Sequence, residues 1–187
     1  MSEIDNLEAG KEYYFLDSEV VQRKAKGAKW SEEFNAISSD DIETQEKKAK
    51  EILGSHGEKV SLQAPIHFDY GRNIHVGEDF LSNYNFTVLD IAPVNIGNNV
   101  MIGPNVDIYT VNHPLTIEGR RKYKAQAFPV TIGNDVWIAG RVVIMPGITI
   151  GDNVVIGAGA VVTHNIPDNS IAAGVPARVI KHLNKNK

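Results

Sequence analysis

The hydrophobic positions of residues 130–166 recur every six residues, in the hexads VTIGND, VWIAGR, VVIMPG, ITIGDN, VVIGAG and AVVTHN. In each hexad two aliphatic residues stand two positions apart, so in a strand both point to the same face. A small residue often follows, where the backbone must turn. A short fixed period is typical of a solenoid, and hexapeptide repeats are a known β-helix class. The pattern therefore predicts an all-β solenoid, with three strands per coil and a core shared between coils.

The same step runs upstream through Ile96, Ile102 and Ile108, and less cleanly between residues 74 and 88. Its phase slips at 90–93, and the period breaks outright between about 111 and 129. Long loops in repeat proteins usually carry function, and this insertion contains His113. It is also locally basic, at Arg120, Arg121, Lys122 and Lys124. An arm that reaches a neighbouring subunit or covers an anionic ligand would look like this, and so would an exposed flexible loop.

Residues 1–60 are charged and lack the hexad. The segment Asp17-Ser18-Glu19 precedes residues 20–37 and predicts a capped helix there. Ser38 to Asp41 has the spacing of a capping box before a second helix that ends near Gly54. We therefore expect a helical segment at 1–60, packed on the first coils of a β-helix domain at 61–187 with a short C-terminal extension. The basic cluster at 23–29 fits a phosphate patch or, more commonly, a solvated helix face.

Composition narrows the class of protein. The 187 residues suit one domain with an appendage, and a net charge of −4 gives no electrostatic case for nucleic acid. Because there is no cysteine, disulfides, thiolate zinc sites and a cysteine nucleophile are excluded. The first residues lack the apolar core of a signal peptide, and no run is long enough to span a membrane. We expect a soluble, cytoplasmic protein without nucleic-acid or membrane partners.

Three residues are candidates for chemistry. His113 stands in the insertion, and histidine suits general-base work because its ordinary pKa lies near the working pH. Trp137 lies between Val136 and Ile138, so by alternation it points outward, where it needs a ligand or a partner subunit. Asn83 and Asn85 flank Tyr84, so both point to the same side of a strand or turn. Asparagine in such a place is commonly a turn or ladder residue, and its amide can also bind a hydroxyl or carbonyl group.

Longer motifs resemble a known family. Residues 137–180, WIAGRVVIMPGITIGDNVVIGAGAVVTHNIPDNSIAAGVPARVI, resemble the C-terminal signature of the hexapeptide acyltransferases. With the N-x-N of 83–85, the IGPNVDIYTVNHP of 102–114 and the charged helical N-terminus, the chain resembles the maltose and galactoside O-acetyltransferase branch over nearly its whole length. The NHP loop and the GVPARVI ending are more specific than the hexads.

The resemblance implies a left-handed parallel β-helix in homotrimers, with sites between subunits. Acetyl-CoA would be the donor, a hydroxyl of a maltose, glucoside or galactoside type of sugar the acceptor, and no metal is expected. By resemblance, His113 is the general base, Asn83 reaches in from the adjacent subunit to position the acceptor and the acetyl group, and Asp69 contacts the acceptor. The implied coenzyme-binding positions are Gly103, Trp137, Gly140, Ala158, Thr163, His164, Arg178 and Lys181.

The chemistry of acyl transfer agrees with these roles. An alcohol is a poor nucleophile at neutral pH, so a base must take its proton. The tetrahedral intermediate needs hydrogen-bond donors for its oxyanion, for which a backbone N–H near Gly140 and the amide of Asn83 are candidates. No cysteine or serine motif suggests an acyl-enzyme, so we expect direct transfer in a ternary complex.

The chain departs from the family at two places on the acceptor side. Ala125 stands where members often carry a glutamate close to the histidine, so either a backbone carbonyl orients His113 or activity is weak. Members also often carry a tyrosine–aspartate pair that touches the acceptor. Here the segment reads Tyr13-Tyr14-Phe15-Leu16-Asp17, which leaves that carboxylate displaced or absent.

Other functions are open to the same fold. The acceptor could be another small molecule, such as an antibiotic or serine. A zinc enzyme of the carbonic anhydrase type needs three suitably placed histidines, whereas the next histidine after His113 is His164. A non-catalytic scaffold would explain the hexads but not the insertion. All these proteins would trimerise, so assembly alone does not distinguish them.

Overall fold

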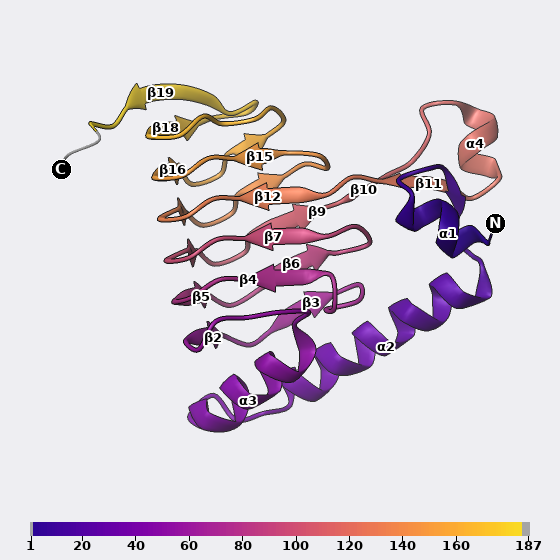
Figure 1. Cartoon of the computed structure of the whole chain (residues 1–187), viewed down its shortest axis with the longest axis horizontal. Coiled ribbons are helices and arrows are strands. Elements are labelled where there is room, and N and C mark those ends of the chain that lie inside the picture. Colours follow the sequence, from indigo (N-terminus) through magenta and orange to yellow (C-terminus); the bar gives the residue numbers. More distant parts are fainter. Residues whose placement is uncertain (1, 185–187) are drawn as a thin grey trace.

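The computed structural model describes residues 2–184, in which short parallel strands wind into a stack of triangular coils (Figure 1). We name each side of the triangle by its first strand. The β2 side holds β2 (Val60–Leu62), β5 (Phe80–Ser82), β8 (Met101–Ile102), β13 (Trp137–Ile138), β16 (Val154–Ile156), β18 (Ser170–Ala173) and the antiparallel β19 (Arg178–His182). The β3 side holds β3 (Ile66–Phe68), β6 (Phe86–Leu89), β9 (Asp107–Tyr109), β14 (Val143–Ile144) and β17 (Val161–Val162). The β4 side holds β4 (Ile74–Val76), β7 (Val94–Ile96), β12 (Val130–Ile132) and β15 (Thr149–Ile150).

The aliphatic columns predicted from the hexads form the core. On the β2 side Ile138 pairs with Ile102 in one neighbouring coil and with Ile156 in the other, and all three are buried. A single coil would leave these side chains open to water at both ends, so each coil depends on the next to cover them. The predicted fold class, a left-handed parallel β-helix with an N-terminal helical segment, is confirmed.

Asparagines turn the chain between the β2 and β3 sides. Asn85 and Asn105 have φ of 58° and 57°, in the left-handed region that this side chain tolerates better than most. Asn85 Nδ2 donates to Asn105 Oδ1 at 3.1 Å. The two side chains therefore stack from one coil to the next and fix the position of this corner.

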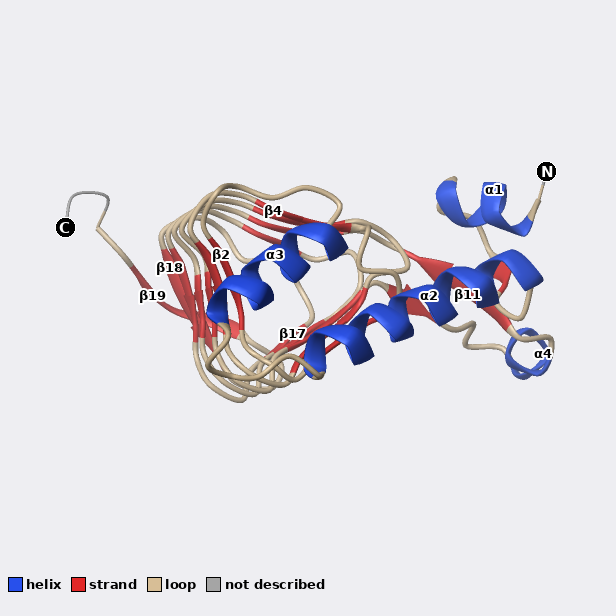
Figure 2. Ribbon diagram, turned by 90° about the horizontal axis from the view of Figure 1, so that it is seen from below, coloured by secondary structure: helices blue, strands red, loops and turns tan. Residues whose placement is uncertain are grey.

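The corner between the β3 and β4 sides is where the repeat is interrupted. The inward positions Phe68 and Val76 lie eight residues apart rather than six, and so do Val88 and Ile96. One coil later the same corner opens into the insertion, with β10 (Val111–Asn112), α4 (Ile117–Arg121) and β11 (Lys124–Ala127). β10 and β11 pair antiparallel, and β11 also pairs with the N-terminal strand β1 (Tyr13–Tyr14). Figure 2 shows this small sheet projecting from one corner of the triangle.

Two helices, α2 (Ser18–Asn35) and α3 (Ile42–Ile52), cover the N-terminal end of the stack, and α1 (Glu3–Glu8) lies beside β1 (Figure 1). Asp17 caps α2 as predicted, and Gly27 lets this helix approach the Asp69 carbonyl so closely that a Cβ would lie 2.1 Å from its oxygen. α3 packs its buried Ala49 and Ile52 into the core of the coils. None of the helices within residues 2–184 is long and apolar enough to cross a membrane.

Two sequence-based expectations about this end were wrong or incomplete. The N-cap of α3 is Asp41, whose carboxylate accepts from the Thr44 N–H at 3.2 Å. Ser38 instead donates to Asp40, so the predicted capping box does not form. The helix α1 was not predicted from the sequence; it is short and has its own capping box between Ser2 and Asp5. The final residues of the predicted C-terminal extension, 185–187, lie outside the described residues.

Candidate active site

His113 lies directly after β10, and its side chain is exposed. Its Nδ1 donates to the backbone carbonyl of Lys124 in the paired strand at 3.1 Å. Because a carbonyl can only accept, Nδ1 carries a proton in this contact, which makes Nε2 the ring nitrogen that can serve as a base. Of the two expectations raised by Ala125, orientation of His113 by a backbone carbonyl is therefore confirmed. Ala125 itself is buried opposite Tyr13.

A pocket of about 120 Å³ lies beside His113. Lys24 lines it together with the imidazole, and the remaining lining residues are apolar or aromatic: Tyr13, Phe15, Val20, Ile91, Val111 and Ala125. Burial raises the pKa of Tyr13, so this phenol stays protonated at neutral pH. The pocket thus places a histidine and an ammonium group against a largely apolar wall.

The N-terminal segment reaches this pocket with an aromatic ring instead of a carboxylate. Phe15 packs edge-on against His113, with 5.1 Å between ring centroids. Asp17 turns away to cap α2, where its Oδ1 accepts from the Glu19 N–H at 2.9 Å. The sequence left open whether the carboxylate of this segment is displaced or absent from the acceptor side. The structure shows that Asp17 is displaced, because it caps α2, and that Phe15 packs on His113.

Asp69 follows β3 at the same corner of the triangle and is buried. Its Oδ1 forms an ion pair with Lys24 Nζ at 3.1 Å, and its buried Oδ2 has no hydrogen-bond partner within residues 2–184. Burial raises the pKa of Asp69, and Lys24 opposes that shift. Of the pair, Lys24 lines the pocket and Asp69 does not.

Asn83 lies at a different corner, between β5 and β6. Its Oδ1 accepts from the Tyr84 N–H at 3.0 Å. Its Nδ2 makes no hydrogen bond within the described chain and is free to donate. The insertion that carries His113 leaves the triangle between the β3 and β4 sides (Figure 2), so the two residues lie at different corners of one chain.

The predicted coenzyme positions fall at two corners and on the β2 side. Gly103, Gly140 and Ala158 stack in successive coils at the corner of Asn83. A Cβ on Gly103 would lie 2.6 Å from the Gly140 nitrogen, so only glycine fits there. Thr163 and His164 follow β17 at the other end of the β3 side.

The C-terminal hairpin brings Arg178 to His164. Arg178 Nη1 lies 3.4 Å from His164 Nδ1, and Thr163 Oγ1 lies 2.8 Å from the same nitrogen. A pocket of about 280 Å³ opens beside this pair. Lys181 is exposed further along β19, opposite Ile171, and no contact joins it to the group.

Trp137 points outward from the β2 side, as alternation predicts, and 49 % of its surface is exposed. It pairs with Met101 in the coil below, which in turn pairs with Leu81, and both of these side chains are also exposed. A contiguous exposed apolar row of this kind marks a surface for a ligand or another subunit.

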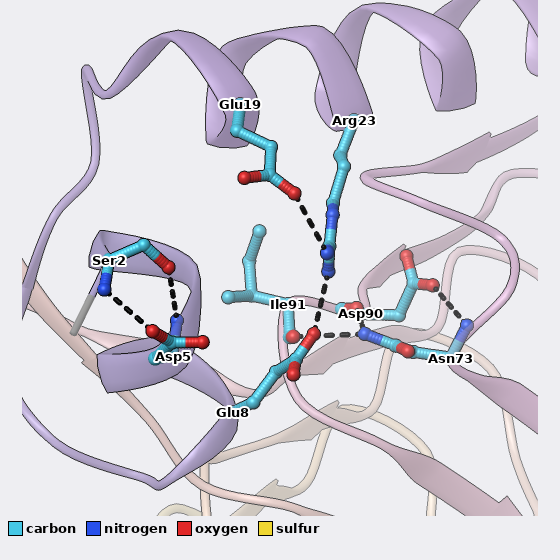
Figure 3. A network of polar contacts seen from close by, with 8 residues as sticks. All are labelled: Ser2, Asp5, Glu8, Glu19, Arg23, Asn73, Asp90 and Ile91. Atoms are coloured by element: carbon cyan, nitrogen blue, oxygen red, sulfur yellow. Dashed lines mark hydrogen bonds and ion pairs between the residues drawn. The ribbon is translucent and has the colours of Figure 1, made fainter.

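The basic cluster at 23–29 is largely paired with carboxylates. Arg23 donates to Glu8 at 3.1 Å and to Glu19 at 3.2 Å, which joins α1 to α2 (Figure 3). Lys29 lies 3.9 Å from Glu33. These contacts favour a paired helix face over a phosphate patch. Within residues 2–184, no three histidine, aspartate or glutamate side chains gather where a metal ion could be held.

The residues that sequence reasoning missed are Phe15 and Lys24, and it left open which carbonyl orients His113. Phe15 and Lys24 come from a segment remote in sequence, so no local motif contains their contacts with this pocket. The three aromatic residues at 13–15 could have indicated that this segment forms an apolar wall, but not which residue it would contact.

Comparison with known proteins places the chain among acetyltransferases. Residues 129–164 match the bacterial transferase hexapeptide family (six repeats), and residues 8–57 match the maltose acetyltransferase hexapeptide capping motif. The chain is 43 % identical to the galactoside O-acetyltransferase of Escherichia coli (strain K12) over 96 % of its own length and 89 % of that protein.

Two solved structures are similar over almost the whole chain. A maltose O-acetyltransferase from Clostridium difficile 630 is 45 % identical with a TM-score of 0.97, and the match covers 99 % of both chains. A galactoside acetyltransferase in complex with coenzyme A is 42 % identical with a TM-score of 0.94, over 98 % of this chain and 92 % of that one.

Proposed function

The chain belongs to the family of maltose and galactoside O-acetyltransferases, which use acetyl-CoA, and we propose that it acetylates a hydroxyl group of a sugar. A maltose, glucoside or galactoside type of sugar fits the relatives' names. The observation that carries the mechanism is the bond from His113 Nδ1 to the Lys124 carbonyl, which leaves Nε2 free beside a pocket.

His113 acts as the general base. Its Nε2 takes the proton of the sugar hydroxyl as that oxygen attacks the thioester carbonyl of acetyl-CoA. The proton then passes to the departing thiolate of coenzyme A, so transfer is direct and no acyl-enzyme forms. A positioned base of this kind contributes about 100- to 10,000-fold to the rate.

The negative charge of the tetrahedral intermediate needs donors. Asn83 Nδ2 and the backbone N–H of Gly140 are suited to this role, because both lie at one corner and neither donates a hydrogen bond within residues 2–184. Removing one such donor typically costs about 2.7–4 kcal/mol of transition-state stabilisation.

A homotrimer would complete this site. His113 and Asn83 leave different corners of one triangle, so a site that uses both draws them from two subunits. In a closed ring of three, each His113 meets the Asn83 of a neighbour. The exposed apolar row of Leu81, Met101 and Trp137 offers surface for that contact or for the coenzyme.

The coenzyme would lie along the solenoid between subunits. Gly103, Gly140 and Ala158 supply backbone groups that an extended chain can approach closely. Trp137 offers an aromatic surface, and the group of Thr163, His164 and Arg178, with Lys181 beyond it, suits the charged end of the coenzyme. On the acceptor side, Lys24 rather than Asp69 faces the pocket.

The test is acceptor-dependent release of the coenzyme A thiol from acetyl-CoA, measured over a panel of maltose, glucosides, galactosides, serine and antibiotics. We expect release with the sugars. His113→Ala should lower kcat by about 100- to 10,000-fold and leave acetyl-CoA affinity within about twofold. The matched control is His67→Ala, an exposed histidine on β3, which should retain full activity.

Other outcomes of the same assay would reject the proposal. Full activity in His113→Ala would remove this residue from the mechanism. Release with serine or an antibiotic alone would reassign the acceptor, and failure to bind acetyl-CoA would remove the coenzyme role of the predicted surface.

A further inference from the structure

The hydrogen bond of His113 fixes one atom of its ring and leaves the plane of the ring free. Within the described chain that bond, from Nδ1 to Lys124, is the one hydrogen bond the imidazole makes. Rotation about the line of the bond keeps it intact while Nε2 moves. A base must hold its nitrogen on the reacting oxygen to be effective, so a second contact has to set the plane.

Phe15 supplies that second contact. Its ring meets the imidazole at a centroid distance of 5.1 Å and an interplanar angle of 69°. Edge-to-face packing of this kind is a preferred geometry of aromatic pairs, because the positive edge of one ring faces the negative surface of the other. Rotation of the imidazole about its hydrogen bond would break this arrangement.

The chain holds Phe15 in place from two directions. Its N–H donates to the Tyr123 carbonyl at 3.0 Å, and the Tyr123 ring packs on it at 5.7 Å and 85°. The preceding residue, Tyr14, pairs with Lys124. The ring that touches His113 and the carbonyl that binds it are therefore anchored to the same strand, β11.

We propose that Phe15 is a positioning residue for His113: its ring sets the plane of the imidazole while the Lys124 carbonyl sets the tautomer. This role rests on the proposed function of His113 as the base.

Two other roles for Phe15 make different predictions. If its ring bound the acceptor, since it also lines the pocket, substitution would raise KM for the acceptor and would still matter without His113. If it only stabilised the fold, substitution would lower thermal stability and act equally in any background. A positioning residue instead lowers kcat and has no effect once His113 is gone.

The experiment compares Phe15→Leu, Phe15→Tyr and the matched control Tyr14→Leu, each in the full-length protein and in a His113→Ala background. Tyr14 is the exposed neighbour in β1 and makes no ring contact with His113 in the described chain. Initial rates with acetyl-CoA and the best sugar of the panel give kcat and both KM values. Protein concentration is raised for the His113→Ala proteins so that their residual rate is quantified, and thermal unfolding is recorded for each variant.

We expect Phe15→Leu to lower kcat by about 10- to 100-fold, the cost of a misplaced catalytic group, with both KM values within about threefold. Phe15→Tyr keeps the ring and should retain kcat within about threefold, and Tyr14→Leu should match the parent. In the His113→Ala background, Phe15→Leu should change the residual rate by less than about twofold.

The proposal would be overturned if Phe15→Leu lowered the rate by the same factor in the parent and in the His113→Ala background. A change confined to the acceptor KM, or an unchanged kcat in Phe15→Leu, would also overturn it. Loss of both activity and folding in Phe15→Leu leaves Phe15→Tyr to decide, since a folded but equally slow Phe15→Tyr protein would also contradict the role. Failure of His113→Ala to lower activity would instead reject the proposed base itself.

Discussion

At the scale of single residues, Asp90 is a fully buried carboxyl group at the corner that later opens into the insertion. Its Oδ1 accepts from the Tyr70 N–H at 2.8 Å and its Oδ2 from the Asn73 N–H at 3.2 Å. Asn73 donates back to the Asp90 and Ile91 carbonyls (Figure 3). Burial raises the pKa of Asp90 from 3.8 to about 6, because the backbone N–H groups offset only part of the lost hydration.

Asp90 therefore gives folding a pH dependence of definite sign. A carboxyl group whose pKa rises on folding holds its proton more tightly in the folded state. Its stabilising contribution is complete below pH 3.8 and is lost as pH rises through about 6. A shift of this size corresponds to about 3 kcal/mol.

We expect Asp90→Asn to remove this dependence, because the amide cannot ionise. Between pH 4 and pH 7, the unfolding free energy of the parent should fall by up to about 3 kcal/mol relative to that of Asp90→Asn. Urea unfolding at fixed protein concentration measures this change. The exposed Glu12→Gln should show no such trend. A constant difference across this range would contradict the burial of a titrating Asp90.

At the scale of elements, the N-terminal strand β1 and the insertion form one small sheet in the order β1, β11, β10. The Tyr14 N–H donates to Glu3 Oε2 at 2.6 Å, and Lys124 Nζ lies 3.8 Å from Glu3 Oε1. α1 thus ties β1 to β11. Residues near the N-terminus are joined in this way to Lys124, and the ring of Phe15 that packs on His113 comes from a segment about 100 positions away in sequence.

The helix α3 offers a test of local capping. Asp41→Ala should lower the unfolding free energy by about 1 kcal/mol, because the Thr44 N–H loses its acceptor at the start of the helix. Ser38→Ala should cost less, since Ser38 makes no capping bond and is the matched control. Urea unfolding of both variants measures this, and a larger loss for Ser38→Ala would restore the capping box predicted from sequence.

At the scale of the whole molecule, the two candidate catalytic side chains lie at different corners. Trimers assembled from two different variants can test whether they act in one site. If one site takes His113 from one subunit and Asn83 from the next, a trimer of mixed variants can rebuild an intact site. Neither variant can do so with itself, because every interface then lacks the same residue.

Subunits carrying His113→Ala and subunits carrying Asn83→Ala should therefore complement each other. After equal amounts are unfolded, mixed and refolded together, random assembly gives about one intact site in four, hence about a quarter of parental activity. The refolded single variants set the baseline. If the mixture were no more active than that baseline, His113 and Asn83 would not act in one intersubunit site.

The candidate site could be predicted only in part. His113 stood out because it interrupts a regular pattern, and Trp137 because alternation in a strand fixes the direction of a side chain. The role of Trp137 as a coenzyme contact stays a prediction. Ala125 raised the question of what orients His113, and the Lys124 carbonyl answered it. Phe15 and Lys24 were missed because their contacts depend on which neighbour folding brings within reach, whereas the cap Asp41 was missed in a choice between two local candidates, Ser38 and Asp41.

The sequence by itself determined the period, the coil and the core, because the two aliphatic positions of each hexad share a face by local geometry and need only the next coil to be buried. It also located the insertion. Tertiary structure alone decided that β1 crosses to β11, that Asp69 is neutralised by Lys24, and that His113 and Asn83 occupy separate corners. The two contacts join segments far apart in the chain, and they depend, like the placement of the corners, on packing geometry that no local pattern encodes.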